Sequence, residues 1–123
     1  MIKAMILAGC GGVVGTCGRY LLGKWASGMF HCEFPMGTFF VNIIGCFIIG
    51  LFFGLLEKAH VMTPGENVLL ITGFCGGFTT FSSFANDLWV LGNKGDWTTG
   101  IIYLCASVII GVLLVCGGRA LIR

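Results

Sequence analysis

An apolar stretch long enough to cross a bilayer is interrupted near its middle by glycines and hydroxyls, and this interruption constrains the fold more than any other feature. Residues 73–84 read Gly-Phe-Cys-Gly-Gly-Phe-Thr-Thr-Phe-Ser-Ser-Phe. Irregular backbone at membrane depth persists only where other protein covers it or where it lines a water-filled cavity. The segment 76–80, with two glycines and two threonines, therefore predicts a broken helix whose freed carbonyls and hydroxyls face a polar species such as an ion.

The whole chain has the composition of an integral membrane protein. Of its 123 residues, 57% are hydrophobic and only 10% are charged, and the mean hydropathy is +1.00. A soluble domain carries about a quarter charged residues, and a transmembrane helix needs roughly 20 apolar ones. We therefore expect an all-α, integral membrane four-helix bundle that occupies residues 1–123 as a single domain, with spans at about 4–22, 37–56, 68–91 and 99–121.

Positive charges are almost evenly divided between the two expected sides of the membrane. One side, with the N-terminus, the second loop and the C-terminus, carries Lys3, Lys58, Arg119 and Arg123. The opposite side carries Arg19, Lys24 and Lys94. An excess of Lys and Arg normally marks the cytoplasmic side, so four against three gives little direction. Either this small imbalance fixes one orientation, or the chain inserts both ways and pairs antiparallel with itself.

Small residues at four-residue spacing permit close contact between membrane helices. They are Gly11 and Gly15 in the first span, and Cys46, Gly50 and Gly54 in the second. Such contacts can form between two copies of the chain or within one copy, and the spacing does not distinguish the two arrangements.

Polar side chains recur on single faces of the expected spans. Thr38 and Asn42 lie four residues apart in the second span and share a face. The fourth span carries a stripe at every fourth residue, made of Thr99, Tyr103, Ser107 and Gly111. A lone hydroxyl or amide can be satisfied by its own helix or by a neighbouring one. A lining assembled from several such faces is the alternative.

The chemistry of such a lining favours a small anion. A cation pathway favours rings of acidic side chains, but Asp87 is the only acid within an expected span. Amides and hydroxyls are donors, and the edge of a phenyl ring carries the positive part of its quadrupole. Phe81 and Phe84 are three residues apart, which makes them neighbours on a helix. Arg19 either raises the potential at an entrance or extends its side chain to the lipid headgroups.

Three segments of the chain resemble the Fluc (CrcB) family of fluoride channels. They are residues 15–20 (Gly-Thr-Cys-Gly-Arg-Tyr), residues 37–45 (Gly-Thr-Phe-Phe-Val-Asn-Ile-Ile-Gly) and residues 73–84 quoted above. The resemblance covers essentially the whole chain. It implies an antiparallel, dual-topology homodimer with two pores, each lined by both protomers. It also implies a multi-pass protein of a microbial inner (plasma) membrane that passively exports toxic fluoride from the cytoplasm.

The resemblance implies roles for individual residues. Asn42 resembles the pore asparagine that hydrogen-bonds fluoride, and Phe81 and Phe84 resemble the rings whose edges face the ion. Gly76 and Thr79 resemble the residues whose backbone carbonyls, two from each protomer, hold a central structural sodium. The remaining matches are the vestibule arginine and the polar track, which correspond to Arg19 and to Thr38, Ser82, Tyr103 and Ser107.

The expected partners are therefore a second copy of the chain, fluoride, sodium and the lipid membrane, and no nucleic acid. Two positions keep an open role. Gly111 stands where some relatives carry another hydroxyl, and Asp87 stands where a glutamate can occur.

Two other functions fit a short four-span chain. A small dual-topology proton-coupled exporter needs a carboxylate deep in its first span, and residues 2–22 contain none. A non-transporting structural subunit of a larger complex would be inert in liposomes. An enzyme is not expected, because no nucleophile–base pair or metal-ligand cluster is apparent and His31 and His60 fall in loops.

Overall fold

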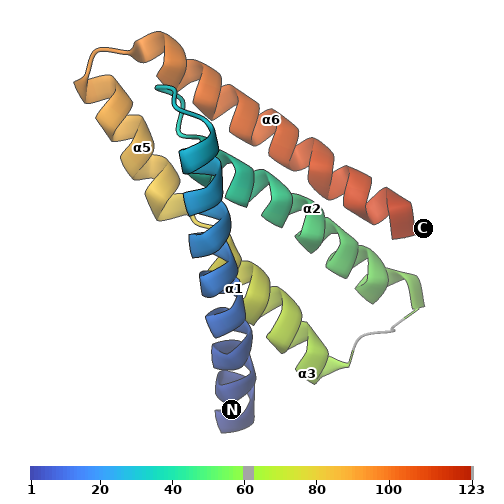
Figure 1. Cartoon of the computed structure of the whole chain (residues 1–123). Coiled ribbons are helices and arrows are strands. Elements are labelled where there is room, and N and C mark those ends of the chain that lie inside the picture. Colours follow the sequence, from blue (N-terminus) through green and yellow to red (C-terminus); the bar gives the residue numbers. More distant parts are fainter. Residues whose placement is uncertain (60–62, 123) are drawn as a thin grey trace.

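Four long helical segments make up the computed structural model, which describes residues 1–59 and 63–122 (Figure 1). Three of them are continuous: α1 (Ile2–Met29), α2 (Met36–Ala59) and α6 (Trp97–Ile122). The other extends over Pro64–Asn93 in several pieces. All four are long and apolar enough to cross a membrane, which confirms the predicted all-α, four-span architecture.

Each of these segments contains the span that the sequence predicts at its position. The expected loop residue His60 and the terminal Arg123 lie outside the described residues.

The third segment consists of two helical arms joined by two extended residues. The first arm contains a capped turn, a π-helix and a final turn, which are α3 (Pro64–Asn67), η1 (Val68–Cys75) and α4 (Gly76–Phe78). The second arm is α5 (Phe81–Asn93). Thr79 and Thr80 between them are extended, with φ/ψ of −86°/156° and −148°/120°. Figure 1 shows α3 and α5 at opposite ends of the molecule.

The predicted break is therefore present, but the glycines are not the residues that leave helical geometry. Gly76 has helical angles, φ −63° and ψ −36°. The interruption lies at Thr79 and Thr80, immediately after the glycine pair.

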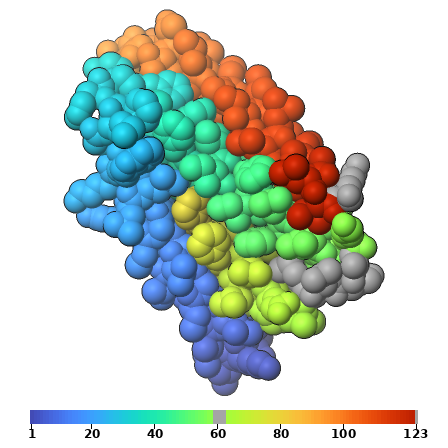
Figure 2. All heavy atoms as spheres, turned by 45° about the vertical axis from the view of Figure 1, so that its right-hand side comes forward, coloured from blue at the N-terminus to red at the C-terminus, as the bar shows by residue number. Residues whose placement is uncertain are grey.

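Glycines let the helices of one chain approach backbone to backbone. A Cβ at Gly50 of α2 would lie 2.4 Å from the Val115 carbonyl oxygen of α6. A Cβ at Gly11 of α1 would lie 2.1 Å from the carbonyl oxygen of Leu69 in η1. The predicted small-residue contacts are thus used within the protomer. Figure 2 shows the middle of the third segment, in yellow, as a strip between α1 in blue and α2 in green.

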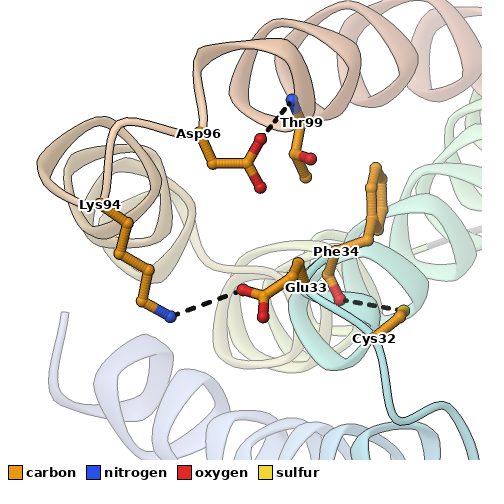
Figure 3. Close-up of polar contacts among 6 residues, drawn as sticks. All are labelled: Cys32, Glu33, Phe34, Lys94, Asp96 and Thr99. Carbon is orange, nitrogen blue, oxygen red and sulfur yellow. Dashed lines mark hydrogen bonds and ion pairs between the residues drawn. The ribbon is translucent and has the colours of Figure 1, made fainter.

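The first and third connections lie at the same end of the molecule, as four alternating spans require. Lys94 Nζ lies 3.7 Å from Glu33 Oε2, and Asp96 Oδ1 accepts the backbone N–H of Thr99 at 3.3 Å (Figure 3). Both side chains of the Lys94–Glu33 pair are mostly exposed, so the pair contributes little stability. The pair shows instead that the first and third connections lie next to each other, although they are far apart in the sequence.

Candidate functional site

The break in the third segment is held by hydrogen bonds from its own threonines. Thr79 donates twice to the Cys75 carbonyl, from its backbone N–H at 3.0 Å and from its Oγ1 at 2.9 Å. Thr80 Oγ1 accepts the backbone N–H of Ser83 at 3.3 Å and so caps the start of α5. Ser82 Oγ lies 3.3 Å from the same hydroxyl. Because threonine hydroxyls satisfy helix ends, these two residues end one arm and begin the next.

Asn42 ties the break to α2. Its Oδ1 accepts the backbone N–H of Thr80 at 2.9 Å, and its Nδ2 donates to the Thr80 carbonyl at 3.0 Å. The side chain therefore supplies both backbone partners that Thr80 lacks outside a helix. A carboxamide nitrogen carries two hydrogens, and this pairing uses one of them. Asn42 thus positions the break and keeps one donor for another acceptor.

The carbonyls of Gly76 and Thr79 are among those beside the break that lose their helical donors. In a continuous helix the N–H of Thr80 would donate to the carbonyl of Gly76, but it donates to Asn42. The N–H of Ser83 would likewise donate to the carbonyl of Thr79, but it donates to the Thr80 hydroxyl. Carbonyls at unwound helix segments are sodium ligands in membrane proteins, so the carbonyl oxygens of Gly76 and Thr79 are suitable ligands for that ion.

Gly76 and Thr79 border a polar hollow of about 380 Å³, called the carbonyl hollow below. Its walls come from α1, from the break and from the start of α5. The lining residues are Thr16, Arg19, Gly76, Gly77, Thr79, Thr80, Phe81, Ser82 and Ser83.

The two phenyl rings expected in the pore border a second hollow of about 350 Å³, called the aromatic hollow. The ring centroids of Phe81 and Phe84 are 6.0 Å apart. Phe84 is only 9% exposed and packs 5.0 Å from the Tyr103 ring, whereas Phe81 is 78% exposed. The other lining residues are Asn42, Cys46, Ile49, Thr79, Thr80, Ser107 and Val108.

Tyr103 and Ser107 lie one turn apart on α6 in different surroundings. Tyr103 is fully buried, and its hydroxyl donates to Asp87 Oδ2 at 3.0 Å. Ser107 Oγ is buried too, but it has no hydrogen-bond partner among the residues that the structure describes. Because a tyrosine hydroxyl has a single proton, Tyr103 uses its donor on Asp87. The Ser107 hydroxyl can serve another acceptor.

Arg19 of α1 reaches the break from the opposite side. Its Nε donates to the Gly77 carbonyl at 3.0 Å, across 58 positions of sequence. Arg19 also borders a third hollow of about 390 Å³, the basic hollow, together with Lys24 and Thr38. Both charged residues that line this hollow are positive, which favours anions. Of the two alternatives for Arg19, the contact with the break favours a role in the site over one at the headgroups.

The predicted site residues are thus divided among three hollows. Asn42, Phe81, Phe84 and Ser107 share the aromatic hollow, while Thr38 lies in the basic hollow. Gly76, Thr79 and Ser82 share the carbonyl hollow, and Arg19 borders it as well as the basic one. Tyr103 lies behind Phe84 and lines none of the three.

The sequence predicts Gly77 and Thr80 as parts of the break at 76–80 but gives neither a role of its own. Thr80 borders all three hollows, and Gly77 supplies the carbonyl that Arg19 binds. Thr80 had a readable signal, because a threonine directly before an apolar helical pattern is a typical helix cap. Gly77 acts through its carbonyl, and no sequence pattern tells which side chain will bind that carbonyl.

Comparison with known proteins identifies the family. Residues 6–119 match the family described as CrcB-like protein, Camphor Resistance (CrcB). The fluoride-specific ion channel FluC of Rhizobium johnstonii (strain DSM 114642 / LMG 32736 / 3841) is 42% identical over 123 residues, covering 100% of this chain and 98% of that protein. Proteins of the same name from Rhizobium meliloti (strain 1021) and Azobacteroides pseudotrichonymphae are 40% and 36% identical. The alignment with the Rhizobium meliloti protein covers 97% of this chain and 95% of that protein. The alignment with the Azobacteroides protein covers 93% of this chain and 97% of that protein. Because the match extends through all four helical segments and the break, the chain belongs to the CrcB family of fluoride-specific ion channels.

Proposed function

We infer that this chain forms a fluoride-selective channel that lets toxic fluoride leave the bacterial cytoplasm passively. The observation that carries this inference is similarity over the full length to proteins named fluoride-specific ion channels. The aromatic hollow supports it, because a ring pair, an amide and a free hydroxyl meet there. The four apolar segments make the chain a multi-pass membrane protein.

The donors of the aromatic hollow suit fluoride in number and strength. Fluoride is small and strongly hydrated, so a narrow path must replace its water with several donors at once. The second Nδ2 hydrogen of Asn42, the Ser107 hydroxyl and the edges of two rings can do so. Each donor is neutral and therefore weak, which lets the ion leave again. A larger halide is excluded by size.

A second copy of the chain completes the pathway in this proposal. Phe81 is 78% exposed although it borders the aromatic hollow, so one side of that hollow is open to a partner. The near-even division of positive charge supports insertion in both orientations and hence an antiparallel pair. Two copies of one hollow, each closed by the other protomer, make two pores.

A structural sodium at the centre of this dimer is part of the proposal. The carbonyls of Gly76 and Thr79, two from each protomer, would hold it. When bound, the ion supplies a positive charge that holds these carbonyl dipoles together. Asn42 and the Thr80 hydroxyl serve the site indirectly, because they engage the two amides that would otherwise bond these carbonyls.

Ion efflux from liposomes tests the proposal. Proteoliposomes loaded with fluoride should empty quickly, and those loaded with chloride should empty hardly at all. Phe81→Ile should slow fluoride efflux by at least tenfold. The matched control is Trp89→Ile, which removes another exposed aromatic of α5 that lies outside the aromatic hollow and should leave efflux unchanged.

The same assay separates the alternatives. Equal fluoride and chloride rates would refute selectivity, and inert liposomes would favour a structural subunit. Efflux that requires a proton gradient would favour an exporter, although α1 contains no Asp or Glu to couple one.

A further inference from the structure

Arg19 is shared by the basic hollow and the carbonyl hollow. It lines both of them, together with Thr80 and Ser83. On the carbonyl side its Nε binds the oxygen of Gly77, the residue that follows the proposed sodium ligand Gly76. One cationic side chain therefore borders a place suited to anions and a place suited to a cation.

The guanidinium group can serve both places at the same time. It carries five N–H donors in a rigid planar fork, and its charge is permanent. The contact with Gly77 uses only the Nε–H. The distal Nη groups keep four donors, which suits an anion in the basic hollow.

We propose that Arg19 couples anion binding in the basic hollow to sodium binding in the carbonyl hollow. This coupling rests on the sodium site of the proposed function. The guanidinium charge raises the potential in the carbonyl hollow and so weakens cation binding. A fluoride ion on the distal nitrogens offsets that charge, and sodium then binds more tightly. Linkage requires the converse as well, so sodium strengthens fluoride binding by the same factor.

Lys3 provides the matched control for this coupling. It is a positive residue of α1, as Arg19 is, but it is exposed and lines neither the basic hollow nor the carbonyl hollow. Removing Lys3 takes one positive charge from α1 and leaves the bridge between the two hollows in place.

The test is a sodium titration of the purified full-length protein in detergent, read as the thermal unfolding temperature. Choline replaces sodium at constant ionic strength, and the anion is either fluoride or gluconate. For the wild type, fluoride should lower the half-stabilising sodium concentration by about fivefold, the low end of usual coupling factors. Lys3→Gln should keep that shift.

Two Arg19 variants separate charge from geometry. Arg19→Gln removes the charge, so sodium should bind more tightly in gluconate and fluoride should have no further effect. Arg19→Lys keeps the charge but replaces the fork with a point charge that cannot occupy both places. The fluoride shift should then fall below about twofold, which is smaller than the usual coupling factors between two sites.

Several results would overturn the coupling. They are a full fluoride shift in Arg19→Gln or in Arg19→Lys, a lost shift in Lys3→Gln, and no shift in the wild type. If Arg19→Gln does not fold, the Arg19→Lys titration decides. A wild type that sodium stabilises equally in both anions would refute the coupling alone. A wild type that sodium does not stabilise at all would refute the sodium site with it.

Discussion

Two helix contacts in this molecule use glycine in the same way and yet do different things. Between α2 and α6, a Cβ at Gly50 or Gly118 would lie 2.4 Å or 2.6 Å from a backbone oxygen of the other helix. Between α1 and the third segment, Gly15 and Gly73 make equally close contacts, at 2.2 Å and 2.6 Å. Only the second contact contains a π-helix and a break. Close glycine packing therefore does not by itself interrupt a helix.

The difference lies in where the polar groups are. Along α2 and α6 the ion pair of Arg119 with Glu57 lies near the helix ends, where Arg119 also stacks 5.2 Å from the Phe53 ring. Beside the break, hydrogen bonds from Arg19 and Asn42 act within the segment itself. A helix can open at membrane depth where side chains replace its lost backbone partners. The first contact thus leaves both of its helices continuous, and the second contains the break.

The largest effect is expected from overpacking the contact between α2 and α6. Gly50→Ala should destabilise the protein by about 1–3 kcal/mol, because the new methyl would meet the Val115 carbonyl oxygen. Thermal unfolding and the recovery of monodisperse protein in detergent measure it. Gly117→Ala is the control, since a Cβ there has no neighbour within 4 Å among the described residues. Equal stability of the two variants would mean that α2 and α6 do not touch through their backbones.

A smaller effect on folding and a large one on transport are expected at the break. Asn42→Asp removes the N–H donor to the Thr80 carbonyl and places a negative charge in the aromatic hollow. An unpaired carbonyl costs about 1–3 kcal/mol when it is fully buried and less at the half-buried Thr80, and the charge repels fluoride. Fluoride efflux should fall at least about tenfold, a change of about 1.4 kcal/mol, while the protein still elutes as a folded species. Asn93→Asp makes the same change at the exposed end of α5 and should conduct normally. Normal efflux from Asn42→Asp would remove Asn42 from the pathway.

The smallest effect is expected from Ser107→Ala, which separates transport from stability. The Ser107 hydroxyl has no partner within the described chain, so its removal should not lower the unfolding temperature. If fluoride uses this donor, efflux should slow by about two- to tenfold, the value of one hydrogen bond. Thr98→Val removes an exposed hydroxyl from the same helix and is the control. A loss of stability in Ser107→Ala would show that the hydroxyl already has a partner in the folded protein.

Much of the fold could be predicted because the bilayer imposes length and apolarity. The four spans follow from those two properties alone, and the glycines and hydroxyls of residues 73–84 located the break to within a few residues. The π-helix could not be foreseen. Residues 68–75 are apolar throughout, apart from one threonine, and such a run has no period that separates one helix type from another.

The site was predictable as a set of side chains but not as a set of contacts. Asn42 and Arg19 were both expected in the site. Asn42 binds the backbone of Thr80, 38 positions away, and Arg19 binds the backbone of Gly77, 58 positions away. Backbone partners are the same for every residue type, so no sequence pattern reveals them. The bond from Tyr103 to Asp87 joins two side chains and is hidden for a different reason, because sequence spacing does not tell which acceptor a hydroxyl will find.

The two extended threonines have an electrical consequence for the third segment. An unbroken helix has one positive and one negative pole, both near the membrane surfaces. Extended backbone at Thr79 and Thr80 adds a second pair of poles in the interior, with the negative end of one arm facing the positive end of the next. A cation and an anion can therefore each find a favourable potential within a few residues of one another, in a stretch that has no formally charged side chain between Glu66 and Asp87.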